Sequence, residues 1–98
     1  MKKGDIITLV LTNGAEIIGE FVDAGADTYT VNRPRMLQAS QSGVGLVDGV
    51  CMSGEKPEGN MEINKTGVIF VIETVDEIAK GYKQQVTGLV LSTSGITS

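Results

Sequence analysis

Residues 6–22 read IITLVLTNGAEIIGEFV, and this stretch decides the fold. Two runs rich in apolar and β-branched residues flank Asn13-Gly14, and both turn residues tolerate the positive φ that a type I′ hairpin turn requires. The stretch therefore predicts an antiparallel hairpin, with one strand over 5–12 and a second over 15–23.

A glycine interrupts the second strand of this hairpin. Strand alternation places Ile17, Gly19 and Phe21 on one face. Because Gly19 has no side chain, it marks strong curvature or the close approach of another backbone segment. A bent strand in so short a chain predicts a small β-barrel.

Apolar and β-branched runs continue through residue 72 and predict further strands. Pro34 has no amide hydrogen to donate, so strand pairing is interrupted there or lies on a sheet edge. The run 68–72 is apolar on both faces, and we expect a second subunit to cover one of them. The Gly- and Pro-rich stretch 54–60 predicts an exposed connection. The later strands are expected at 28–32, 36–39, 46–52, 61–64 and 68–72, with a turn at 65–67.

A short helix is expected after the strands. Thr74 and Glu77 have the spacing of a capping box, in which each side chain bonds the amide of the other residue. The apolar residues that follow form one helical stripe, so we expect a helix over 75–85. A tail over 86–98 follows, in which residues 89–91 form an edge strand or are disordered. The stripe consists of Val75, Ile78, Ala79, Tyr82 and Val86.

Composition fits one globular domain over 1–98, with the barrel over 5–73. The chain has 98 residues, of which 41% are hydrophobic and 20% are charged, and its mean hydropathy is +0.10. A formal net charge of −4 argues against broad electrostatic binding to a nucleic-acid backbone but leaves room for a small local site. No apolar run approaches the ~20 residues of a membrane span, and no signal peptide is visible, so we expect a cytoplasmic protein without membrane contact.

The absence of histidine narrows the chemistry. Without imidazole the chain has no Ser-His or Cys-His nucleophile pair and no His metal site. The single Cys51 cannot form a disulfide within the chain, and it is expected as a small buried apolar residue. Since no catalytic constellation is visible, we expect no enzyme activity, no cofactor and no metal.

Two stretches resemble the Sm/LSm family of ring-forming RNA-binding proteins. Residues 63–68, INKTGV, stand where the second family motif joins strands 4 and 5, without the Arg-Gly of the eukaryotic and archaeal forms or the Tyr-Lys-His of the bacterial form. With a helix after the strands, the chain is most similar to short phage-type Sm-like proteins. The positions that resemble the first motif are Leu9, Leu11, Asn13, Gly14, Ile17, Gly19 and Phe21.

The resemblance implies a strongly bent five-stranded antiparallel barrel with a short C-terminal helix. It also implies a homo-oligomeric ring, in which strand 4 of one subunit pairs with strand 5 of the next. Single-stranded RNA would bind this ring without catalysis, with a base stacked on Tyr29 and a phosphate near Lys65. The residues implied to bind RNA are Asp27, Tyr29, Thr30, Asn64 and Lys65.

Two alternatives stay open at this point. Tyr29 can instead be a cross-strand packing residue. The same ring can also act as an adaptor between proteins without binding RNA, with the helix 75–85 or the loop 54–60 as its contact surface. The acidic composition favours this second function.

Overall fold

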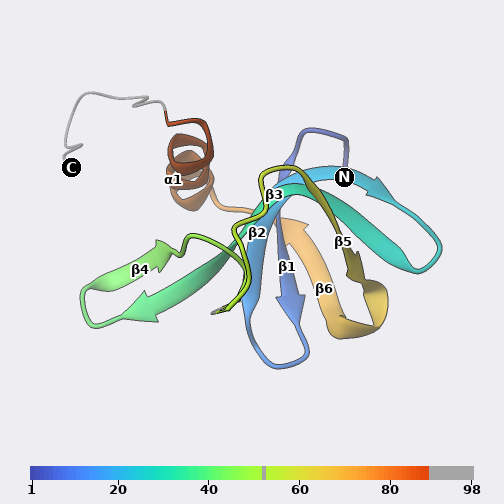
Figure 1. The fold of residues 1–98 in the computed structure, drawn as a ribbon, viewed down its shortest axis with the longest axis horizontal. Helices are drawn as coiled ribbons and strands as arrows, with labels where there is room; N and C mark the ends of the chain where they lie inside the picture. The colour runs from blue at the N-terminus through green and yellow to red at the C-terminus, as the bar shows by residue number, and fades with distance from the viewer. Residues whose placement is uncertain (52, 89–98) are drawn as a thin grey trace.

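The computed structural model describes residues 1–51 and 53–88. Figure 1 shows a twisted sheet with one helix beside it, so the expected mainly β class with a C-terminal helix is confirmed. In chain order the elements are β1 (Ile6–Leu11), β2 (Glu16–Ala24), β3 (Thr28–Ser40), β4 (Gly43–Leu46), β5 (Asn60–Asn64), the 3-10 helix η1 (Lys65–Gly67), β6 (Val68–Glu73) and α1 (Asp76–Thr87).

The sheet has six antiparallel strands in the order β4-β3-β2-β1-β6, and β5 also pairs with β3. One end of β3 pairs with β5 over Thr28–Asn32, and the other end pairs with β4 over Leu37–Ser40. Within the described ranges β5 and β6 do not pair with each other, so the sheet is not closed. The expected strongly bent five-stranded barrel is therefore wrong in two respects. The sheet has six strands, because β3 is long enough to pair with both β4 and β5, and in the described part of the chain it stays open between β5 and β6.

The first hairpin forms where the sequence predicts it, but its turn differs from the expected one. Gly14 has φ +90°, whereas Asn13 is not among the positive-φ residues, so a type I′ turn is ruled out. The Asn13 side chain accepts a hydrogen bond from the Ala15 amide at 2.9 Å, and the Gly14 amide donates to the Leu11 carbonyl at 2.9 Å. Asparagine thus stabilises the turn through its side chain, and only the glycine needs the left-handed conformation.

The sheet bends where β2 crosses β3, as Gly19 indicates. Arg33 and Pro34 together stand opposite Gly19, a bulge that spares Pro34 from donating a ladder bond. A Cβ added to Gly19 would lie 3.2 Å from the Cβ of Val31, which confirms the close approach. Pro34 does not end the strand, and the two predicted segments 28–32 and 36–39 form one strand, β3.

Buried side chains lie on both faces of the sheet. One face carries the main core, a cluster of Ile7, Leu9, Ile17, Phe21 and Val31. The other face packs against α1 through Tyr82, which is 2% exposed. The Tyr82 hydroxyl donates to the carbonyls of Asn32 and Arg33 at 2.8 and 2.9 Å, so the helix is tied to the bend in β3.

The strand expected at 46–52 does not form over residues 47–51, and residue 52 lies outside the described ranges. The chain pairs with β3 earlier, over Gly43–Leu46, and then turns at Gly49, whose φ is +152°. The position of β3 sets this register, since the Val47 amide donates to the Met36 carbonyl at 2.9 Å and the Met36 amide donates to the Gly49 carbonyl at 2.8 Å. Cys51 follows this turn and is exposed, which overturns its expected burial.

The helix begins without the capping box. Val75 is its N-cap, and no side chain caps the first turn. The Thr74 hydroxyl is instead hydrogen-bonded to the hydroxyl of Thr8 in β1 at 2.8 Å, which links the helix entry to the sheet. The helix also takes up residues 86–87, which were expected in the tail, whereas the prediction for residues 89–91 lies outside the described ranges.

The apolar strand β6 lies at the end of the sheet, and among the described residues it pairs on one side only, with β1. Val71 contacts the main core, while Ile69, Phe70 and Ile72 are exposed. The connection expected at 54–60 is mostly exposed, as predicted, and its last residue, Asn60, is the first residue of β5. No helix in residues 1–51 or 53–88 is long and apolar enough to cross a membrane.

Candidate nucleic-acid interface

Two loops that are far apart in the sequence meet at one corner of the sheet. Pairing of β3 with β5 places Tyr29 opposite Ile63 and Thr28 opposite Asn64. The backbone amide of Lys65 then donates to the carbonyl of Asp27 at 2.8 Å, which joins the β2–β3 loop to the start of η1. The backbone therefore holds the two predicted RNA-binding segments against each other.

The side chains of Tyr29 and Lys65 are in contact at this corner. The Lys65 Nζ lies 5.1 Å from the centroid of the Tyr29 ring, a cation–π pair. At a partly exposed site such a pair stabilises the structure by about 0.5–1 kcal/mol. Tyr29 is half-buried and also packs against the main core, so its ring is oriented before any ligand arrives.

The five predicted RNA-binding residues do not form one cluster. Asp27 is exposed and joins the corner through its backbone carbonyl. Thr30 and Asn64 stand one register position away from Tyr29 and Ile63, so strand alternation puts them on the opposite face, with Glu62. The side-chain site thus consists of Tyr29 and Lys65.

Charge at this corner is mixed. Lys65 supplies one positive charge, and Asp27 and Glu62 are exposed acids on the neighbouring backbone. Affinity for nucleic acid depends strongly on the number of phosphate contacts, and the Lys65 side chain could supply only one such contact at this corner. In the part of the chain that the structure describes, no three His, Cys, Asp or Glu side chains are placed to hold a metal ion.

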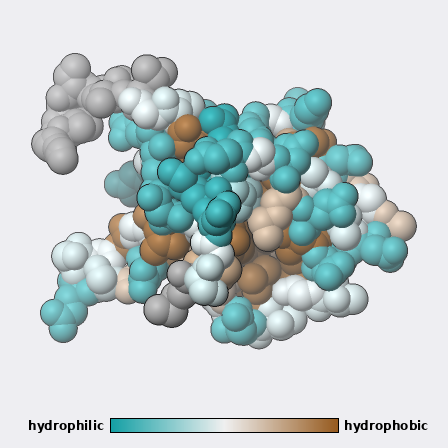
Figure 2. Space-filling view, in the orientation of Figure 1, coloured by the Kyte–Doolittle hydropathy of each residue, from teal (hydrophilic) through white to brown (hydrophobic). Residues whose placement is uncertain are grey.

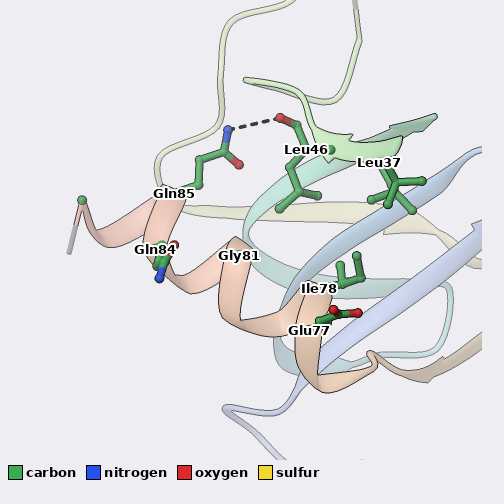
Figure 3. Close-up of a pocket in the computed structure, with 10 residues that line it drawn as sticks. Leu37, Leu46, Glu77, Ile78, Gly81, Gln84 and Gln85 are labelled. Carbon is green, nitrogen blue, oxygen red and sulfur yellow. Dashed lines mark hydrogen bonds between the residues drawn. The ribbon is translucent and has the colours of Figure 1, made fainter. Parts of the chain in front are cut away.

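A second surface feature, which the sequence reasoning did not find, lies between α1 and the sheet. A cavity of about 470 Å³ separates the helix from the β3–β4 arm, and a neighbouring one of about 300 Å³ continues toward β6. Leu37 and Ile78 line both, so we treat the two cavities as one helix groove. Figure 3 shows Leu37, Leu46 and Ile78 facing the space between helix and sheet, and the Gln85 side-chain amide donating to the Leu46 carbonyl.

No protein-family model matches the chain, and no curated protein matches it either. The residues and their geometry therefore carry the functional argument.

Proposed function

We propose that this protein is an Sm-like homo-oligomer that assembles as a ring and binds single-stranded RNA without catalysis. The observation that carries the proposal is the contact of the Lys65 ammonium with the Tyr29 ring, 5.1 Å from its centroid. An aromatic face next to a cation suits a nucleotide, because a base stacks on the ring while the cation meets the phosphate. The two groups come from the two loops that the family resemblance implies.

The strand order supports assembly into a ring. Each of β5 and β6 pairs with one strand only, β3 and β1 respectively, so each has a free edge in the described part of a single subunit. A free edge with exposed apolar residues such as Ile69 and Phe70 is an aggregation hazard unless another strand covers it. Pairing of β6 with β5 of a neighbouring copy satisfies both edges and repeats around a closed ring.

Ring assembly also compensates for the weakness of one site. A nucleotide that stacks on Tyr29 displaces Lys65 from the ring, and the released ammonium then pairs with the phosphate. A second copy brings a second Tyr29–Lys65 pair, and an RNA strand that reaches both sites gains from a high effective concentration. In this way an acidic protein can bind RNA through a few repeated contacts.

The first test is binding of short fluorescently labelled RNA oligomers at several salt concentrations. Tyr29→Ala should weaken binding by about 1–3 kcal/mol per occupied site, because the stacking surface is lost. Tyr29→Phe should retain most of the affinity, since it keeps the ring. Lys65→Ala should lower the slope of log K against log salt by about 1 per site that contacts a phosphate.

Lys56→Ala is the matched control for lost charge, because Lys56 is exposed in the 54–60 connection and pairs with Glu58 at 3.5 Å. It should leave RNA affinity unchanged. Circular dichroism of each variant separates lost binding from lost structure, which matters because Tyr29 packs on the core. The proposal fails if the wild type and the Tyr29→Ala/Lys65→Ala double variant both show no binding above background.

A further inference from the structure

The apolar surface of this protein is concentrated in the helix groove. Among the described residues six large apolar side chains are exposed, and four of them line the groove. Figure 2 shows hydrophobic residues between α1 and the β3–β4 arm, with hydrophilic residues around them. An exposed apolar surface bordered by polar residues is typical of a binding site. The four exposed side chains are Val44, Phe70, Ile72 and Val75.

The charges along the groove all have one sign. Glu16, Glu73 and Glu77 line it, and no Lys or Arg is among the described residues of its lining. The other polar groups are neutral, such as Gln84 and Gln85 on α1. The groove is therefore complementary to an apolar ligand with positive charge at its borders, whereas the same three carboxylates repel nucleic acid.

We infer that the helix groove binds a short segment of a partner protein that carries large apolar side chains next to Lys or Arg. The volumes of its two parts, about 470 and 300 Å³, suit apolar side chains from such a segment. The helix is one of the two surfaces that the sequence favours for protein contacts.

This inference does not rest on the proposed RNA binding. The groove is lined by Thr8, Val10 and Ile18, whereas Ile7 and Ile17 point into the main core on the other face, against which Tyr29 packs. The two sites therefore lie on opposite faces of the sheet, and each can fail in an experiment without the other.

The test uses a fluorescently labelled amphipathic peptide of leucine and lysine, with a leucine–glutamate peptide of the same pattern as its counterpart. The lysine peptide should bind, and the glutamate peptide should bind at least roughly tenfold more weakly. Glu73→Gln/Glu77→Gln should weaken binding of the lysine peptide by roughly tenfold at low salt. Glu55→Gln/Glu58→Gln changes the charge equally at exposed positions outside the groove, and should have little effect.

A second pair of variants tests the apolar contact. Ile72→Thr keeps a β-branched residue in β6 and should weaken the peptide roughly fivefold, because less apolar surface is covered. Ile69→Thr is the control for peptide binding, since Ile69 is in the same strand, is 60% exposed and is outside the groove lining. Because Ile69 also lies on the proposed ring edge, light scattering must show the same oligomeric state for both variants.

Three results would overturn the inference. Equal losses of peptide affinity in Glu73→Gln/Glu77→Gln and Glu55→Gln/Glu58→Gln would mean that the peptide responds only to the net charge of the protein. Tighter binding of an uncharged peptide with the sequence of residues 89–98 would assign the groove to the end of this chain. A peptide affinity that falls as the protein concentration rises, in step with self-association, would assign it to a second copy.

Discussion

Tyr82 is the residue through which the helix is fixed to the sheet. Its ring is 2% exposed, and its hydroxyl donates to two backbone carbonyls at the bend of β3. Tyr82→Phe removes the hydroxyl donor from both carbonyls, so we expect the free energy of unfolding to fall by about 1–2 kcal/mol. Urea denaturation measures this change. Tyr29→Phe, on a half-buried ring, is the matched control and should change stability by less than about 0.5 kcal/mol.

The same residue makes stability depend on alkaline pH. Burial raises the pKa of Tyr82 above its ordinary value of 10.0, Glu20 adds to the increase and Arg33 opposes it. Because the folded state favours the neutral phenol, this stabilisation is complete below pH 10 and is lost as the pH rises through the higher folded pKa. Urea midpoints of the wild type should fall more steeply above pH 10 than those of Tyr82→Phe. Parallel curves would contradict this linkage.

At the scale of the element, two glycines give opposite predictions for the same substitution. Gly19→Ala in β2 places a Cβ 3.2 Å from the Cβ of Val31, a buried atom close to the backbone, and should destabilise the protein by about 1–3 kcal/mol. Gly81→Ala in α1 meets nothing within 4 Å and should stabilise it by about 1 kcal/mol through helix propensity. Thermal or urea unfolding measures the stability change of each variant. A change of the same sign in both variants would contradict the close approach of the backbone at Gly19.

Elements with local signals were predictable from the sequence, and the others depended on distant partners. The first hairpin was predictable because two β-rich runs flank Asn13-Gly14, although the turn is not of the expected type I′. In contrast, β4 has two glycines in four residues and forms because β3 extends beside it. The predicted capping box does not form for a similar reason. The Thr74 hydroxyl is hydrogen-bonded to the hydroxyl of Thr8, which is far away in sequence.

The candidate sites divide in the same way. The family resemblance pointed to Tyr29 and Lys65, and the structure adds the contact between their side chains, whereas their role in RNA binding stays a prediction. The helix groove was not predictable from the sequence, because it exists only once Ile78 of α1 has packed opposite Leu37 of β3. No local pattern in either segment contains that arrangement.

For the whole molecule the prediction concerns oligomeric state. Light scattering should give a mass that is a multiple of 10.3 kDa at micromolar concentration. Ile69→Lys adds a charge to the free strand β6 and should shift the protein toward monomer while the circular dichroism spectrum is retained. Val44→Lys, at an equally exposed apolar residue of β4, should leave assembly unchanged. A wild type that stays monomeric would overturn the ring.

The pairing of β1 with β6 has a kinetic consequence. It joins the first and last strands of the described residues, whereas β1–β2, β2–β3 and β3–β4 are pairs of strands that follow each other in the chain. Contacts between distant segments pay a larger loop-closure entropy, so β6 should dock late in folding. During that interval the edge of β1 is open to strands of other molecules, and refolding yield should drop as protein concentration increases.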